Sequence, residues 1–313
     1  MLGKTAGGLF WMFRYLERSE NTARLVDSGF RMALTRGEEA DDEWASVVTT
    51  AGLRFEFEAT EQPFDAPSVV NFLLRDKSNP SSVLSVIDGA RNNAKTVRTA
   101  LTREVWEAVN ECWSTLHAVL ARPVRERDLP EILATIRQQS ALVRGALHGT
   151  MLRNDIYNFT RIGSFIERAD NTARIVDVKY YVLLPSVSFV GSSLDNAQWE
   201  SILRSASGER AFRWLYEGEM GPAQIANFLM LDRRMPRSLA FCYDKIVRNL
   251  DYLTSDYGEA LPSLHKARDI LVELKANTIQ SIFDHGLHEY VQRLIAENAA
   301  LGAQIEIDYR FTE

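Results

Sequence analysis

Two segments of the chain each carry a carboxylate, an amide and a guanidinium at helical spacing. In the first segment these groups belong to Glu17, Asn21 and Arg24. Residues three, four or seven positions apart lie on one face of a helix, so the three side chains form a stripe. Arginine pairs well with a carboxylate or a phosphate, and glutamate pairs with an amine. Such a stripe suits an amino acid, a peptide or an acyl phosphate as its ligand.

The second segment repeats this stripe with Glu167, Asn171 and Arg174. Arg18 and Arg168 directly follow the two glutamates, and each lies on the flank of its stripe, about 100° around the helix axis. The candidate ligand-binding set therefore has two matching halves: Glu17, Arg18, Asn21 and Arg24 in the first, and Glu167, Arg168, Asn171 and Arg174 in the second.

Two interpretations of these stripes compete. In one, Glu17 pairs with Arg24, or with an arginine of a neighbouring helix, in a polar network that sets how the helices pack. In the other, the two stripes face each other across a pseudo-twofold axis and hold a ligand between them. Ion-pair networks and binding sites use the same residue types, so the sequence leaves both interpretations open.

The two stripes belong to a longer internal similarity. Residues 15–27 align with residues 165–177 at an offset of 150. Residues 71–76 align with residues 227–232 at an offset of 156, and Trp44 aligns with Trp199. The landmarks occur in the same order in both halves, which predicts a duplicated module.

Helical periodicity runs through almost the whole chain. The segments with the two stripes predict long helices, from Leu9 to about Thr35, ended near Gly37, and from Ile156 to about Leu184, stopped by Pro185. Further helices are expected at 43–52, 68–76, 83–101, 104–120, 128–152, 196–205, 208–216, 222–232, 236–255, 262–285 and 286–311. The predicted fold is all-α, a multi-helix bundle of two tandem pseudo-symmetric repeats with little or no strand.

The repeat suggests how the chain divides. Residues 1–127 form the first repeat, and residues 128–257 form a linker helix and the second repeat. Residues 258–313 form C-terminal closing helices, and the three parts are expected to make a single compact unit.

Two smaller signals concern helix ends. The run Asn79–Ser82 reads Asn-Pro-Ser-Ser, which is a helix start with Pro80 expected in the first turn. Arg233, Arg234 and Arg237 form a small basic cluster. It could meet an acidic partner, but we interpret it as a solvated helix end.

Composition excludes several classes of protein. The 313 residues carry a net charge of -6 without a basic stripe, so no nucleic acid is expected as a partner. The apolar run at 9–13 is too short for the core of a signal peptide, and the run at 180–190 is too short to span a bilayer. We therefore expect a cytoplasmic protein with no membrane partner. His285 and His288 lack a third ligand, so no metal site is predicted. Neither Cys112 nor Cys242 lies in a nucleophile motif.

The two Glu-Arg pairs and several other segments resemble the Alpha-E family over nearly the whole chain. The segments that carry the resemblance are Glu17-Arg18, Glu167-Arg168, Asn79–Ser82, Ala90–Arg98, Phe228–Asp232 with Pro236–Ser238, and Gly286–Tyr290. The resemblance implies a helical domain that works with a circularly permuted ATP-grasp protein and with a transglutaminase-like protein. It therefore implies a system that makes or modifies peptide amide bonds, in which the partner uses ATP and Mg while this chain binds no cofactor directly. It implies no catalytic residue set.

Three hypotheses about function follow. In the first, the chain is a non-catalytic or co-catalytic component that binds the ligase, or a peptide or amino-acid ligand, through the Glu-Arg helices. In the second, it is an enzyme that catalyses amide ligation or acyl transfer between the repeats, with Glu17 or Glu167 as general base. In the third, it is a scaffold. Under the first hypothesis, Glu167→Gln is expected to keep the fold and to abolish product formation with the ligase.

Overall fold

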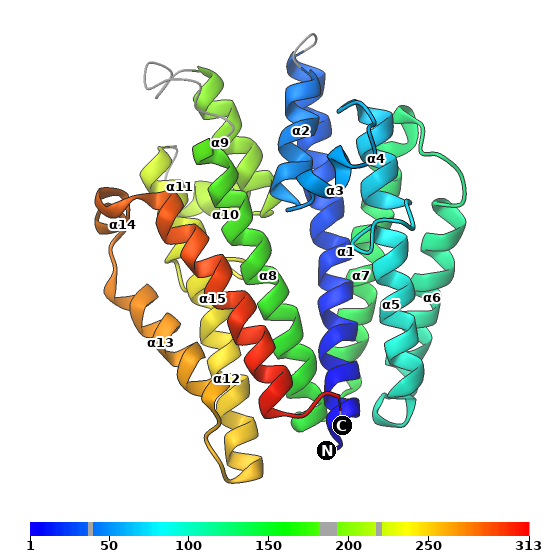
Figure 1. Cartoon of the computed structure of the whole chain (residues 1–313), viewed down its shortest axis with the longest axis vertical. Coiled ribbons are helices and arrows are strands. Elements are labelled where there is room, and N and C mark those ends of the chain that lie inside the picture. The colour runs from blue at the N-terminus through cyan, green and yellow to red at the C-terminus, as the bar shows by residue number, and fades with distance from the viewer. Residues whose placement is uncertain (37–39, 182–192, 217–220, 313) are drawn as a thin grey trace.

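The fold is built around the two long helices that carry the stripes. The computed structural model describes residues 1–36, 40–181, 193–216 and 221–312 (Figure 1). Helix α1 spans Gly3–Arg36 and helix α8 spans Asp155–Tyr181. The helix ends expected near Gly37 and at Pro185 lie outside the described residues.

Every other regular element of the described residues is also helical. Between the long helices lie α2 (Ala40–Thr50), α3 (Arg54–Glu58), α4 (Ala66–Leu74), α5 (Val83–Thr96), α6 (Arg103–Val119) and α7 (Leu129–Thr150). After them come α9 (Ser193–Ser205), α10 (Glu209–Tyr216), α11 (Pro222–Met230), α12 (Leu239–Tyr257), α13 (Pro262–Ala276), α14 (Ile279–His285) and α15 (Leu287–Asp308). The described residues contain no strand, so the fold is all-α as predicted.

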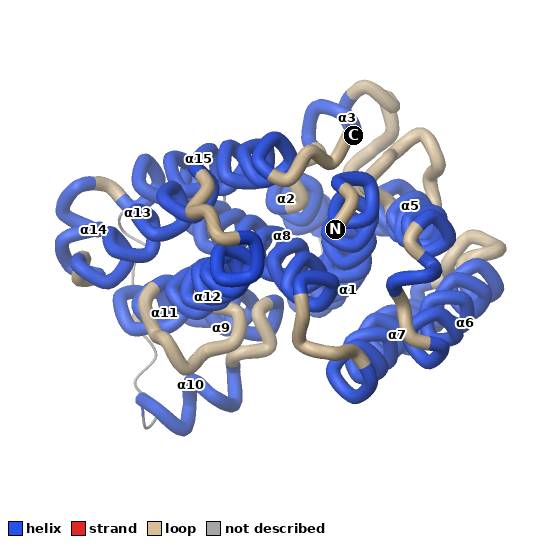
Figure 2. The backbone as a smooth tube through the Cα atoms, turned by 90° about the horizontal axis from the view of Figure 1, so that it is seen from below, coloured by secondary structure: helices blue, strands red, loops and turns tan. Residues whose placement is uncertain are grey.

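Helices α1 and α8 lie side by side in the middle of the bundle, where they make its most extensive helix–helix contact (Figure 2). Helices α5 and α7 pack on α1, and α6 packs on both of them. Helices α12 and α15 pack on α8, and α13 packs on α12 and α15. The stripes of α1 and α8 are thereby enclosed between two groups of helices.

The helix start at Asn79–Ser82 differs in detail from the prediction. Pro80 lies in the turn before the helix, and Ser82 is the N-cap, with its hydroxyl accepting a hydrogen bond from the backbone N–H of Ser85. The Asn79 side chain accepts from the N–H of Ser81 at 2.9 Å. Side-chain capping therefore places Pro80 before the helix, which begins at Val83, the first residue of the expected range.

The helix expected over 262–285 is divided in two. Asn277 has an extended backbone, with φ -80° and ψ 146°, which ends α13. Thr278 and Ser281 then form a capping box that starts α14. Reciprocal hydrogen bonds of this kind satisfy the free N–H groups of a new helix, so the break is stable despite continuous apolar periodicity.

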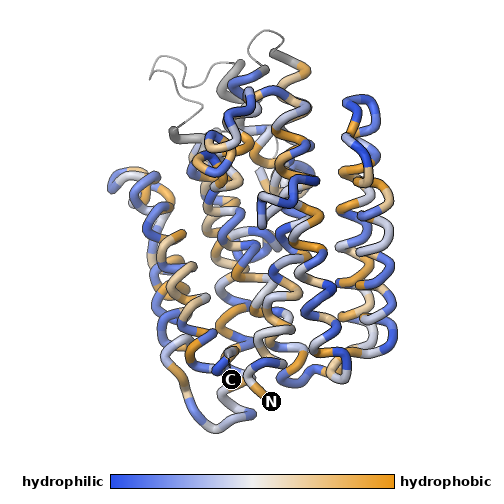
Figure 3. The backbone as a smooth tube through the Cα atoms, turned by 45° about the vertical axis from the view of Figure 1, so that its right-hand side comes forward, coloured by the Kyte–Doolittle hydropathy of each residue, from blue (hydrophilic) through white to orange (hydrophobic). Residues whose placement is uncertain are grey.

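Hydrophobic and hydrophilic positions alternate along the long helices (Figure 3). The apolar positions form one continuous core, whose largest buried side chains include Phe10, Phe13, Trp44 and Phe165. The hydrophilic positions are not confined to the surface, because Glu17, Glu20 and other polar residues of α1 are buried. Among the helices that the structure describes, none has the length and apolarity needed to cross a bilayer.

Candidate functional site

The two Glu-Arg pairs contact each other reciprocally between α1 and α8. Arg18 donates to both carboxylate oxygens of Glu167, at 2.5 and 3.0 Å. Arg168 donates to both oxygens of Glu17, at 2.8 and 2.8 Å. Two-pronged pairing of this kind is the strongest geometry for arginine and carboxylate. Each arginine that the helical wheel placed on the flank therefore reaches the glutamate of the opposite helix.

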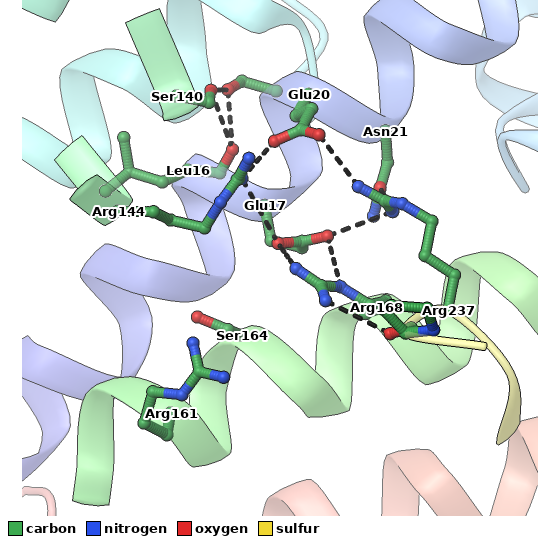
Figure 4. Close-up of polar contacts among 12 residues, drawn as sticks. Leu16, Glu17, Glu20, Asn21, Ser140, Arg144, Arg161, Ser164, Arg168 and Arg237 are labelled. Carbon is green, nitrogen blue, oxygen red and sulfur yellow. Dashed lines mark hydrogen bonds and ion pairs between the residues drawn. The ribbon is translucent and has the colours of Figure 1, made fainter. Parts of the chain in front are cut away.

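Further arginines surround Glu17 and its neighbour Glu20 (Figure 4). Arg237, which precedes α12, lies 3.1 Å from Glu17 and 2.9 Å from Glu20. Arg144 of α7 contacts both carboxylates as well. Arg24 pairs with Glu20 at 2.6 Å rather than with Glu17. The packing interpretation allowed Glu17 to pair either with Arg24 or with an arginine of a neighbouring helix. The contacts match the second possibility.

The arginines keep these carboxylates ionised in spite of burial. Burial alone would raise the pKa of Glu17, but the guanidinium groups of Arg168, Arg237 and Arg144 together hold the pKa well below its usual range. Burial likewise opposes ionisation of Glu167, and Arg18 and Arg14 outweigh it, so the pKa of Glu167 is lowered. All three carboxylates, including Glu20, have lowered pKa values.

We expect the protein to lose stability in acid for this reason. A carboxylate with a lowered pKa in the fold stabilises it above the pKa of the unfolded chain, about 4.3, and this contribution is lost as the pH falls below that value. With Glu17, Glu20 and Glu167 titrating, the free energy of unfolding should fall by up to about 4 kcal/mol per pH unit below pH 4. Urea unfolding at pH 7, 5, 4 and 3 measures this slope. Repeating the series in 1 M NaCl screens exposed pairs, and a slope that vanishes there would assign the effect to the surface.

A partly open cavity of about 190 Å³ lies beside the Arg18–Glu167 pair. Five of the eight candidate residues line it: Arg18, Asn21, Glu167, Asn171 and Arg174. Ser81, Asp170 and residues 50–53, at the C-terminal end of α2, also line it. The cavity is several times the ~30 Å³ that one water molecule occupies, and it presents two carboxylates and two guanidiniums.

Asn21 links the cavity to the charge network. Its side-chain oxygen accepts from Arg237 at 2.8 Å, and its side chain is buried. Its amide nitrogen has no hydrogen-bond partner among the described residues. A buried donor without a partner costs about 1–3 kcal/mol. The Asn21 amide therefore remains an unsatisfied donor inside the network beside the cavity.

The structure separates the other three candidate residues from the cavity. Glu17 and Arg168 pair with each other, and Arg24 lies by Glu20 and Ser207. Sequence reasoning missed Glu20 and Asp170, although both lie within the repeated segment at the offset of 150 and carry the same charge. It also missed Arg144, which belongs to a separate helix and has no counterpart in the motif.

The prediction of a solvated basic cluster is wrong for Arg237. This side chain is buried, with a relative exposure of 7% for the whole residue. Burial lowers its pKa to about 10, so it remains charged at neutral pH. Three acceptors on α1, namely Glu17, Glu20 and Asn21, compensate for its desolvation.

The two cysteines do not behave as nucleophiles. Cys112 and Cys242 are buried free thiols, and burial raises the pKa of each to about 12. Only the thiolate is a good nucleophile, so both remain inert at neutral pH.

Residues 1–309 match the model of the Alpha-E family, which is described as a predicted alpha-helical domain with a conserved ER motif. The chain belongs to the Alpha-E family. The described all-α fold agrees with that description, and two Glu-Arg dipeptides, Glu17-Arg18 and Glu167-Arg168, lie at the centre of this Alpha-E chain.

Uncharacterized proteins of Mycobacterium bovis and Mycobacterium tuberculosis are similar to this Alpha-E chain, with 22% identity over 272 residues. The matched region covers 81% of this chain and 30% of each relative. The chain thus spans less than a third of the length of the curated relatives that it matches. No solved structure matches the chain.

Proposed function

We propose that this Alpha-E protein is the ligand-holding component of an amide-bond-forming system, and that it binds an amino acid or the end of a peptide in the cavity between α1, α2 and α8. The cavity carries this proposal, because its lining combines two carboxylates with two guanidiniums. A ligand with both an ammonium and a carboxylate or carbonyl group is complementary to that combination.

We also propose that the chain is duplicated, with repeats at 1–127 and 128–257 closed by the helices of 258–313. Matching helix ends support this proposal. Helix α2 ends in a Schellman motif, with the N–H of Leu53 bonded to the carbonyl of Val48 and Gly52 in the left-handed region at φ 71°. Helix α9 ends in the same motif at an offset of 155, with Gly208 bonded to Leu203 and Ser207 at φ 53°.

The alternative in which Glu17 or Glu167 is a general base receives little support from the contacts. Both carboxylates accept from guanidiniums that hold the pKa low. An efficient base needs a pKa near the working pH. We therefore place the chemistry on a circularly permuted ATP-grasp partner that uses ATP and Mg, and we place acceptor binding on this chain. A transglutaminase-like protein is a further partner in this proposal.

We expect Asp170→Asn to weaken binding of a dipeptide by about tenfold, which corresponds to 1.4 kcal/mol. The substitution removes one negative charge from the cavity wall without changing its shape. Isothermal titration calorimetry with a panel of free amino acids and dipeptides measures the affinity. Asp251→Asn is the matched control, because the Asp251 side chain is 42% exposed and pairs with Arg268 at 2.6 Å, outside the cavity. If the wild-type protein binds no member of the panel, the proposal fails.

Pull-down experiments distinguish holding a peptide from docking the ligase. If the ATP-grasp protein is retained only when a bound peptide is present, this chain supplies the acceptor. If the ATP-grasp protein is retained without peptide, and Asp170→Asn does not change this retention, the role of the chain is docking instead.

A further inference from the structure

The surroundings of the two central glutamates differ by one cation. Among the described residues, Glu17 has three arginine partners, Arg168, Arg144 and Arg237. Glu167 has two partners, Arg18 and Arg14. Arg18 and Arg168 correspond to each other at the offset of 150, so one partner is equivalent in the two halves. The difference therefore lies between Arg144 and Arg237 around Glu17 and Arg14 around Glu167.

The aligned segments show where the missing cation would be. Pro80, Ser81 and Ser82 align with Pro236, Arg237 and Ser238 at the offset of 156. Ser82 and Ser238 are aligned, and each caps the helix that follows it. The hydroxyl of Ser82 accepts a hydrogen bond from the backbone N–H of Ser85, and that of Ser238 accepts one from the N–H of Phe241. Ser81 thus occupies the position of Arg237.

In the second half of the chain, Arg237 contacts α1 at the place that corresponds to the cavity beside α8. It contacts Glu17, Glu20 and Asn21 of α1. At the offset of 150, the residues that correspond to these three are Glu167, Asp170 and Asn171 of α8, and all three line the cavity. Ser81 lines the cavity too, where its hydroxyl is 3.4 Å from Arg18.

The two halves differ by one in the number of arginines around their carboxylates. The carboxylates Glu17 and Glu20 are paired with four arginines in the described structure: Arg24, Arg144, Arg168 and Arg237. The corresponding carboxylates Glu167 and Asp170 are paired with three, namely Arg14, Arg18 and Arg174. Four arginines and two carboxylates sum to +2 in the first set, and three arginines and two carboxylates sum to +1 in the second. A guanidinium in the cavity would therefore reproduce the balance of the first set. The C-terminal end of α2 also lines the cavity, and the negative end of a helix dipole favours a cation.

We infer that the cavity binds a guanidinium group of the ligand, held by Glu167, Asp170 and Asn171 as Arg237 is held by Glu17, Glu20 and Asn21. The ligand is then an arginine side chain of a peptide, or a small molecule with the same planar fork. This inference rests on the proposed function and on the duplication, and it specifies the chemical class of the ligand.

Calorimetry with two neutral-ended probes tests the guanidinium directly. N-acetyl-arginine amide should bind the wild-type protein at least tenfold more tightly than N-acetyl-citrulline amide, which has the same shape without the charge. Equal affinities for the two probes would overturn the inference. Binding of free dipeptides without binding of either probe would also overturn it, while leaving the proposed function intact.

The Ser81→Arg substitution is expected to fill the cavity with a guanidinium that belongs to the protein, in place of the ligand's guanidinium. We expect this variant to lose binding of N-acetyl-arginine amide by more than tenfold and to unfold at a higher or equal urea concentration. Ser114→Arg, on the exposed side of α6, is the control and should bind as the wild type does. Unchanged binding in a folded Ser81→Arg variant would contradict the inference, and the comparison of arginine and citrulline probes decides the question if that variant does not fold.

Discussion

Glu17→Gln is expected to lower the free energy of unfolding by about 3–5 kcal/mol, because it removes a negative charge shared by three buried or half-buried arginines. Arg168 and Arg237 would each keep a buried positive charge with less compensation. Glutamine keeps the shape of the side chain, so the loss reports charge and not packing. Urea denaturation monitored by far-ultraviolet circular dichroism gives the free energy.

Glu58→Gln is the matched control for this prediction. Glu58 pairs with Arg54 at 2.8 Å on the surface, with both side chains more than 40% exposed. Exposed pairs at this helical spacing contribute about 0.3–0.5 kcal/mol. Equal and small losses in Glu17→Gln and Glu58→Gln would show that the buried network does not hold α1 and α8 together.

The same reasoning changes the expectation for Glu167→Gln. The sequence suggested that this variant keeps its fold and loses function. In the structure, both oxygens of Glu167 accept from arginines, and the residue is buried. Its primary effect should therefore be a loss of stability, which is why Asp170 is the better position for a test of binding.

Gly163→Ala is expected to destabilise the protein by about 1–3 kcal/mol, although alanine is the better helix former. Gly163 lies in α8 where this helix meets α1. A Cβ at this position would come within 2.2 Å of the carbonyl oxygen of Phe10 and 3.0 Å of its carbonyl carbon. Backbone atoms cannot rotate away as side chains do, so the two helices must move apart and the reciprocal Glu-Arg contacts must lengthen.

Gly145→Ala separates this close approach from helix propensity. Gly145 lies within α7 and is exposed, and a Cβ at this position would meet no atom within 4 Å beyond its own helix backbone and chain neighbours. Alanine there should stabilise the protein by about 0.5–1 kcal/mol. Opposite signs for the two variants in urea denaturation are the expected result, and a stabilised Gly163→Ala variant would refute the close contact.

The ion pairs between α1 and α8 determine how the two helices are aligned more than they raise the total free energy of unfolding. Two buried charges gain little over well-packed apolar side chains, whereas one charge without its partner is costly. Rotating either long helix would separate Arg18 from Glu167 and Arg168 from Glu17 together. The reciprocal contacts therefore select one register of α1 against α8, and the cavity beside them depends on that register.

Local patterns in the sequence determined the helices and the two stripes. Apolar periodicity depends on the rotation of 100° per residue within one helix, so it is readable without tertiary contacts. The repeated segment around Glu17 and Glu167 is likewise local, and it indicated the residues that lie between α1 and α8. Division of the last segment at Asn277 escaped prediction because apolar residues continue across the break.

Only the tertiary structure decided which charges meet. Arg18 and Arg168 lie on the flank of their own helices, yet their long side chains reach across to Glu167 and Glu17. Arg237 comes from a turn more than 200 residues away from Glu17, and no pattern within that turn shows that its guanidinium is buried. Such contacts depend on the rotation and separation of whole helices, which a single-helix pattern does not contain. The cavity that Ser81 lines depends on the same arrangement.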